Sequence, residues 1–154
     1  MKTSSANPGA DWPSDRWPVR AETYSTCEQW LRRAEVLSEQ AGSRLSVAKC
    51  RHERGENHRA AGRPAAAESH YAGALEICEA LGSRHQVLCR IKLALCLLQS
   101  GRPARARIAL ERGLQECEAQ GLRNIGPAGR IFLLPCFVTD GDWESWEYPL
   151  KKKH

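Results

Sequence analysis

Two stretches of this chain, GRPAAAESHYAGALEICEALG at residues 62–82 and GRPARARIALERGLQECEAQG at residues 101–121, share one pattern. Ten of their 21 aligned positions are identical, including the opening Gly-Arg-Pro and the Cys-Glu-Ala near the end. Chance would give roughly two matches, so the interval of 39 residues marks an internal repeat.

The repeat extends beyond these two stretches when the chain is shifted by about 40 residues. Identical or similar residues then align in both directions, which gives about three and a half units in all. The aligned sets are Ile91, Leu93, Cys96 and Gly101 with Ile131, Leu133, Cys136 and Gly141, and Tyr71, Ala74, Glu79 and Gly82 with Leu31, Ala34, Glu39 and Gly42.

Each unit is predicted to be a pair of helices. Apolar residues recur at three- and four-residue steps, and Gly, Ser and Pro break the pattern at short intervals, whereas no strand-like alternation occurs. Proline at the first turn of a helix leaves no intrahelical hydrogen bond unmade, which explains Gly-Arg-Pro between the two helices. We expect first helices at 45–60, 84–99 and 127–139, and second helices at 63–81, 102–120 and 142–150. Stacked antiparallel hairpins bury one another's apolar stripes, so the predicted fold is an all-α solenoid.

Length and composition agree with one repeat domain. The chain has 154 residues, 42% of them apolar, and its net charge of +5 permits an anionic partner without requiring one. No apolar run approaches the roughly 20 residues of a membrane span, and no secretory leader begins the sequence, so we expect a cytoplasmic protein with reduced thiols. The predicted division is a flexible arm at 1–20, the repeat domain at 21–150 and a basic tail at 151–154.

Small and bulky residues recur at matching places of the units, such as Ala48, Gly55 and Tyr71 in the first and Ala94, Ala106 and Leu110 in the second. Their spacing resembles that of the tetratricopeptide repeat. The period of about 40 residues in this chain is similar to that of the longer variant of the family, which is found in helical regions of bacterial signalling regulators and kinases. Small residues at these positions let helix backbones approach closely. The positions that carry the resemblance are Ala48, Gly55, His58, Ala67, Tyr71 and Ala74 in the first unit, Ala94, Leu97, Ala106, Leu110 and Gly113 in the second, and Leu134, Phe137, Trp146 and Leu150 in the third.

The chain also departs from the family pattern. Arginines stand at 51, 90 and 130, where a bulky apolar residue is typical early in the first helix. Pro135 lies inside the last of these helices, where we expect it to bend or break the helix.

The resemblance implies a protein-binding groove lined by the first helix of each unit. Carried over, its ligand-facing positions are Lys49, His52, Glu56 and Arg59 in the first unit and Leu88, Ile91, Leu95 and Leu98 in the second. One end of the groove is then charged and the next apolar, which suits a peptide or protein partner with an acidic end and an apolar stretch. The expected function is a scaffold or sensor surface in signalling that binds a protein. The alternative interpretation of the apolar positions is that they belong to the core between repeats.

Other functions have weaker support in the sequence. No phosphate loop, nucleophile elbow or kinase signature occurs, so we expect no enzyme and no cofactor. Nucleic-acid binding through the Arg-rich first helices is the competing function, and it predicts a contiguous basic face and steep salt dependence.

Metal binding is likewise not expected. The i, i+4 pair His52 and Glu56 is interpreted as part of a solvated helix face. The repeated cysteines are interpreted as core residues, although a redox or zinc switch through Cys89, Cys96 and neighbouring thiols remains an alternative. The C-terminal aromatics Trp143, Trp146 and Tyr148 predict self-association if nothing in the chain covers them.

Overall fold

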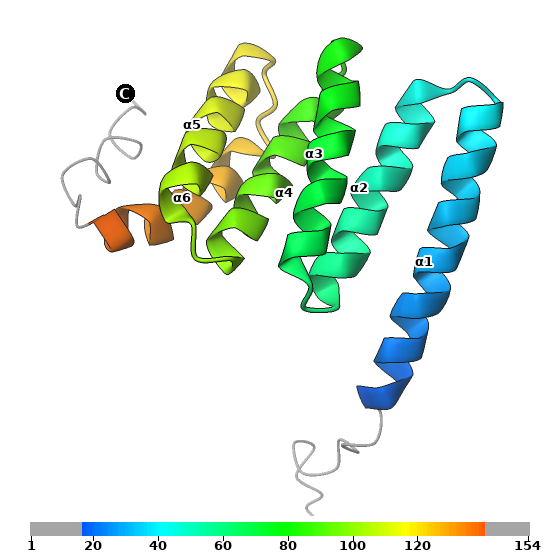
Figure 1. Cartoon of the computed structure of the whole chain (residues 1–154). Coiled ribbons are helices and arrows are strands. Elements are labelled where there is room, and N and C mark those ends of the chain that lie inside the picture. Colours follow the sequence, from blue (N-terminus) through cyan, green and yellow to red (C-terminus); the bar gives the residue numbers. More distant parts are fainter. Residues whose placement is uncertain (1–16, 141–154) are drawn as a thin grey trace, which may run out of the picture.

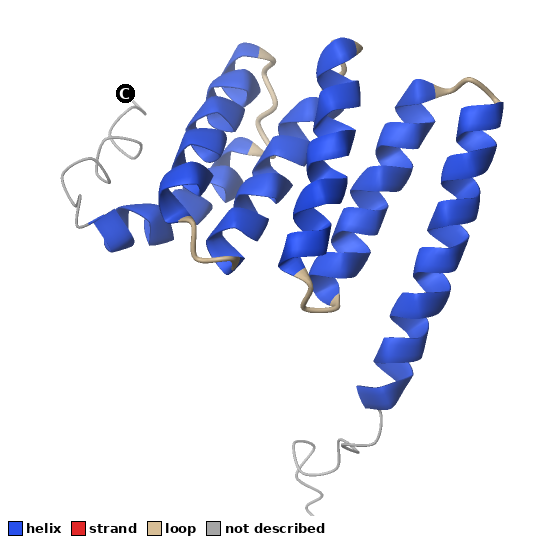
Figure 2. Cartoon of the chain, viewed as in Figure 1, coloured by secondary structure: helices blue, strands red, loops and turns tan. Residues whose placement is uncertain are grey.

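The computed structural model describes residues 17–140, and within that range every regular element is an α-helix, as the repeat pattern predicts (Figure 1). The helices lie side by side in sequence order and are joined by short turns (Figure 2). They are α1 (Trp17–Gln40), α2 (Arg44–Ala60), α3 (Pro64–Ala80), α4 (His85–Gln99), α5 (Pro103–Ala119) and α6 (Gly126–Asp140).

The two Gly-Arg-Pro links have nearly the same conformation. Gly62 and Gly101 have φ values of 72° and 69°, in the left-handed region that glycine adopts without a steric cost. The arginines that follow have φ/ψ of −115°/66° and −117°/61°, and each link closes with a 2.9 Å hydrogen bond from its arginine N–H to the preceding helix, at His58 O and Leu97 O. This equivalence confirms that the repeat in the sequence is a repeat in the structure.

Small residues let the helices pack at close range. A Cβ atom on Gly55 of α2 would lie 2.8 Å from Cε1 of Tyr71 on α3, a ring that is fully buried. A Cβ atom on Gly129 of α6 would lie 2.9 Å from Cδ2 of Leu114 on α5. Glycine at these sites therefore fixes how closely each first helix approaches a neighbouring second helix.

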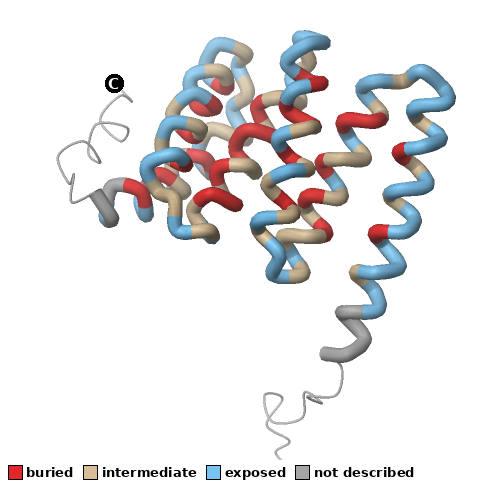
Figure 3. The backbone as a smooth tube through the Cα atoms, viewed as in Figure 1, coloured by how far each residue is buried: buried red, intermediate tan, exposed pale blue. Residues whose placement is uncertain are grey.

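The core is continuous along the middle of the stack and absent from α1. Buried residues join α2 to α3 and α4, and α4 to α5 and α6. In α1 the only buried residues among those whose side chains are described are Glu28 and Glu35, so the helix is exposed along most of its length (Figure 3). Helix α1 is consequently held by polar contacts rather than by an apolar interface.

An ion-pair network attaches α1 to α2. Arg54 donates to Glu28 at 2.7 Å and to Glu35 at 2.6 Å, and Arg51 donates to Glu35 at 2.7 Å. Burial raises the pKa of Glu28, but the hydrogen bonds from Arg54 and Arg32 outweigh it and lower that pKa to about 2. The α1–α2 interface is therefore ionised at neutral pH.

Two features differ from the sequence-based expectation. Helix α1 begins at Trp17, inside the segment predicted as a flexible arm, because Pro18 falls in the first turn, where a missing N–H breaks no helical hydrogen bond. Helix α6 runs through Pro135 to Asp140, so this proline, which was expected to bend or break the helix, does not break it. Proline lacks the N–H that would bond the carbonyl four residues earlier, and the helix continues past it with that one bond missing.

The rest of the predicted organisation lies outside the described residues. This applies to the arm at 1–16, the predicted helix at 142–150 with Trp143, Trp146 and Tyr148, and the basic tail at 151–154. None of the described helices is long and apolar enough to cross a membrane.

Candidate functional site

The eight residues predicted to line the groove differ widely in exposure. His52 and Ile91 are buried, with 4% and 3% of their surface exposed, and they offer no binding surface. Lys49 is exposed, and the remaining five residues are half-buried: Glu56, Arg59, Leu88, Leu95 and Leu98.

Glu56 lies at the centre of a polar network between α2, α3 and α4. The Tyr71 hydroxyl donates to Oε1 of Glu56 at 2.5 Å, Lys92 Nζ lies 2.9 Å from the same oxygen, and Arg59 donates to Oε2 at 2.9 Å. Burial raises the pKa of Glu56, but these three partners lower it to about 2, with Tyr71 the largest contributor. Glu56 is therefore a neutralised structural carboxylate rather than a free charge for a ligand.

His52 faces the boundary between the two central repeats. Its Nδ1 lies 3.5 Å from Sγ of Cys89, and its ring centroid lies 4.9 Å from that of His85. Burial, together with the neighbouring His85, lowers the pKa of His52 to about 4. The interpretation of His52 as part of a solvated face is therefore wrong, because α2 packs against α4 as well as α3 and turns this residue inward.

The apolar part of the predicted groove is divided between core and surface. Ile91 belongs to the buried cluster shared with α5 and α6, and Leu98 packs against that cluster. Leu88 and Leu95 on α4 are half-buried and outside that cluster. The core interpretation thus holds for Ile91, and Leu88 and Leu95 are the apolar residues that α4 presents to solvent.

Helix α6 adds an exposed apolar stripe that the sequence reasoning missed. Ile131, Leu134 and Val138 are 68%, 37% and 47% exposed. The signal for it was present, since Ile131 and Val138 follow Ile91 and Leu98 by one repeat interval. In α4 the equivalent residues pack against neighbouring helices, whereas in α6 no described helix follows to cover them.

The arginines that depart from the family pattern form ion pairs between successive hairpins. Arg90 of α4 pairs with Glu79 of α3, and Arg130 of α6 pairs with Glu118 of α5 at 3.0 Å. Arg90 and Arg130 occupy equivalent positions of the repeat, and so do Glu79 and Glu118. At these positions an ion pair between hairpins therefore replaces the apolar contact of the family pattern, and it is repeated from one unit to the next.

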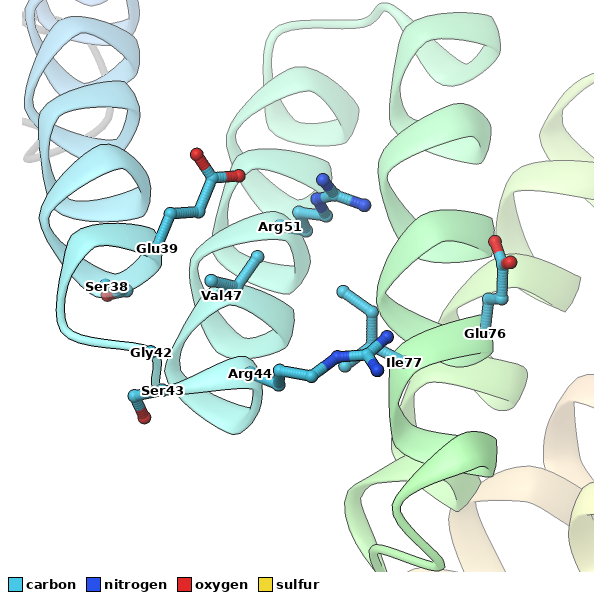
Figure 4. Close-up of a pocket in the computed structure, with 9 residues that line it drawn as sticks. All are labelled: Ser38, Glu39, Gly42, Ser43, Arg44, Val47, Arg51, Glu76 and Ile77. Atoms are coloured by element: carbon cyan, nitrogen blue, oxygen red, sulfur yellow. The ribbon is translucent and has the colours of Figure 1, made fainter.

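A surface hollow of about 360 Å³ lies beside the turn between α1 and α2 (Figure 4). Figure 4 shows the Arg44 side chain extending across it from α2 toward Ile77 of α3. Its charged lining consists of Arg44 and Arg51 with Glu39 and Glu76, so two positive charges stand against two negative ones. This balance gives the hollow little electrostatic preference for a charged ligand.

Two groups of side chains bring metal-ligand atoms together within the described residues. One consists of His52, His85 and Cys89, and the other of Glu28, His58 and His70. In each group the ligand atoms all lie within 4.8 Å of one another. The alternative pair Cys89 and Cys96 does not form such a group, because Cys96 packs with Ala67 and Tyr71 while Cys89 packs with Cys78.

Stacked two-helix units with a shared core define the chain as an α-solenoid. Residues 46–118 match the family described as Tetratricopeptide repeat. The matched residues, just under half of the chain, are therefore similar to tetratricopeptide repeats, and repeats of this family generally mediate protein–protein interaction.

A solved structure with a similar fold is the crystal structure of BtubC (BKLC) from P. vanneervenii. The TM-score is 0.72 at 20% sequence identity, over 90% of this chain and 56% of that one. This chain thus corresponds to little more than half the length of BtubC, and the similarity shows a shared fold. A search of curated proteins finds no match.

Proposed function

We propose that the face formed by α2, α4 and α6 binds a segment of a partner protein, with an apolar stretch of that segment over α4 and α6. The observation that carries this proposal is that the first helices of the repeats keep several apolar side chains at least partly exposed to solvent. Leu88 and Leu95 on α4 are half-buried, and Ile131 on α6 is 68% exposed. Burying such residues against a partner is favourable by about 25 cal/mol per Å² of apolar surface.

The charged end of this face orients the partner. Lys49 on α2 is exposed, whereas Lys92 and Arg59 are already paired with Glu56. Lys49 is therefore the cation of the predicted groove with the least involvement in ion pairs of this chain. An acidic residue at one end of the partner segment would pair with it. A role in signalling, as in the long-period relatives that the sequence resembles, is part of this proposal.

Nucleic-acid binding is less well supported than protein binding. The arginines of α2, α4 and α6 that were expected to form a basic face mostly pair with glutamates of this chain. Those paired are Arg51, Arg54, Arg59, Arg90 and Arg130. A phosphate backbone would have to compete with these carboxylates.

The test is capture of partners from a lysate of the source organism, followed by mass spectrometry, with matched surface variants. The groove variants are Leu88→Glu and Leu95→Glu. The control is Ile108→Glu on α5, where the replaced side chain is 69% exposed and lies outside the proposed face. Circular dichroism and thermal unfolding establish that all three variants remain folded.

A partner retained by the wild type and Ile108→Glu, and lost with both groove variants, supports the proposed face. If folded groove variants retain every partner, the face is not the binding site. Self-association through Trp143, Trp146 and Tyr148 stays a prediction, and size-exclusion chromatography with light scattering tests it, since a monomer at high concentration contradicts it.

A further inference from the structure

A buried group of nitrogen and sulfur ligands lies where α2, α3 and α4 meet. His52 comes from the middle of α2, while His85 is the first residue of α4 and Cys89 follows one turn later on the same face. Cys89 is fully buried and His52 is 4% exposed. The proposed protein-binding face does not use this group of side chains.

The distances fit a tetrahedral metal centre. With metal–nitrogen and metal–sulfur bonds of about 2.0 and 2.3 Å, a tetrahedral angle separates the two ligand atoms by roughly 3.5 Å. The observed distance from His52 Nδ1 to Cys89 Sγ is 3.5 Å. The three ligand atoms of His52, His85 and Cys89 all lie within 4.8 Å of one another, so small side-chain rotations bring them to bonding distance of one ion.

A candidate for a fourth ligand lies beside this group. Cys78, near the end of α3, is fully buried and packs in the same cluster as Cys89, although its thiol lies outside the set of three whose ligand atoms are all within 4.8 Å of one another. With Cys78 drawn in, the ligands would be two cysteines and two histidines. That set is typical of structural zinc, because thiolate and imidazole suit this borderline-soft cation.

One imidazole nitrogen in this group has an unmet bonding capacity. Nε2 of His85 is buried and has no hydrogen-bond partner among the residues that the structure describes. Most buried polar atoms are hydrogen-bonded, so such an atom calls for an explanation such as a bound ion. Charges of both signs lie near the two histidines. Lys49 and Glu53 interact electrostatically with His85, and Lys92 and Glu56 do so with His52.

The second group of potential ligands is less suitable. Its carboxylate, Glu28, accepts hydrogen bonds from Arg54 at 2.7 Å and from Arg32 at 3.0 Å. Both guanidiniums bond Oε1 of Glu28, and the charge of Arg54 also lowers the pKa values of His58 and His70, so a cation bound at Oε2 would face positive charges that already hold α1 on α2. The group at the α2–α4 boundary carries no such ion pair on its ligand atoms.

We propose that His52, Cys78, His85 and Cys89 bind one Zn²⁺ ion that joins the two central hairpins. The imidazole nitrogens contribute lone pairs, and each cysteine exchanges its S–H bond for a sulfur–zinc bond, with the proton released to solvent. The ion links α2, α3 and α4 directly, so its binding free energy adds to the stability of the folded stack. Such a site fixes the angle between the two repeats, and with it the position of α4 relative to α2.

The test uses the full chain, reduced, stripped with a chelator and titrated with Co²⁺ as a spectroscopic probe for Zn²⁺. We expect one equivalent of Co²⁺ to produce thiolate-to-cobalt charge transfer and the visible bands of a tetrahedral centre, and Zn²⁺ to abolish both. Excess Zn²⁺ is expected to raise the thermal midpoint by at least about 5 °C.

A matched pair of cysteine variants on one helix isolates the site. Cys89→Ala removes a proposed ligand, whereas Cys96→Ala removes an equally buried thiol of α4 that lies in another cluster. Loss of a partner outside the ligand shell typically costs about 10–100-fold in metal affinity, so loss of a ligand is expected to cost at least about 100-fold. We expect Cys96→Ala to bind Co²⁺ as the wild type does.

A second pair covers the case in which Cys89→Ala does not fold. His85→Gln removes a partly exposed ligand, and His70→Gln is its control in the other group. Absence of a tetrahedral cobalt spectrum in the wild type overturns the proposal, as does retention of that spectrum in folded Cys89→Ala or His85→Gln. Cys78→Ser is expected to weaken the charge-transfer band, and an unchanged band excludes Cys78 as the fourth ligand.

Discussion

Replacement of Gly55 by alanine tests whether close packing of helices governs the stability of the stack. The added Cβ atom would lie 2.8–2.9 Å from three ring carbons of Tyr71. That ring is fully buried, and its hydroxyl is bonded to Glu56, so it has no room to move aside. The backbones of α2 and α3 must therefore separate.

The size of the effect follows from two opposing terms. Ordinary carbon–carbon contacts are about 3.5–4.0 Å long, so the contact must lengthen by roughly 0.7 Å, and overpacking of this kind costs about 1–3 kcal/mol. Alanine is about 1 kcal/mol better than glycine inside a helix. The expected net loss in the free energy of unfolding is about 0–2 kcal/mol.

Gly73→Ala is the matched control, because it gains the same helix propensity without a rigid clash. Its Cβ atom would lie 3.3 Å from Nη1 of Arg51, the end of a flexible side chain that can shift. We expect Gly73→Ala to stabilise the protein by up to about 1 kcal/mol. The difference between the two variants then isolates the packing cost, about 1–3 kcal/mol.

The assay is urea unfolding followed by circular dichroism of the helical signal under one buffer condition. The reasoning is refuted if Gly55→Ala is as stable as Gly73→Ala, since the contact with Tyr71 would then cost nothing.

Three further predictions concern other parts of the stack. Glu28 has a folded pKa of about 2 against an ordinary 4.5, so its contribution to stability is complete above about pH 5 and is lost as the pH falls toward 2. Thermal midpoints measured from neutral pH into the acid range are expected to fall less steeply in Glu28→Gln, and parallel curves would contradict the role of this network. Gly62→Ala and Gly101→Ala should each lower the free energy of unfolding by about 1–2 kcal/mol, because both glycines have positive φ. Chemical denaturation should give similar losses for the two variants, and a loss at one site alone would contradict their equivalence. Arg90→Ala leaves the carboxylates of Glu79 and Glu116 without this partner, and we expect the free energy of unfolding in urea to fall by about 1–3 kcal/mol. Unchanged stability would show that these ion pairs add nothing.

The helices and turns could be predicted from the sequence because their causes are local. The predicted boundaries at 45–60 and 84–99 lie within a residue of α2 and α4, since apolar periodicity and glycine at the turns act over a short stretch of chain. The start of α1 was missed because the prolines and isolated tryptophans near the beginning of the chain hide the helical period. The continuity of α6 was missed because Pro135 is a strong helix breaker when only the local sequence is considered.

The candidate sites could be predicted only in part. The family resemblance assigned His52, Ile91, Leu88 and Leu95 to one surface, but His52 and Ile91 are buried, and only Leu88 and Leu95 stay partly exposed. The position of a residue in the repeat motif predicts the face of the helix from which its side chain extends. Whether the side chain is buried depends on the residues that the neighbouring helix packs against it.

The sequence by itself determined that this protein is a stack of helical hairpins, because a pattern copied at a nearly constant interval forces each copy to bury its apolar stripe on the next. The tertiary structure decided which polar groups meet. His52, Cys78 and Cys89 come from three helices and are separated by up to 37 positions in the chain. Their proximity results from how the helices pack within and between hairpins, which no local pattern encodes. The close contact of Gly55 with Tyr71 helps to set the spacing of α2 and α3 within one hairpin.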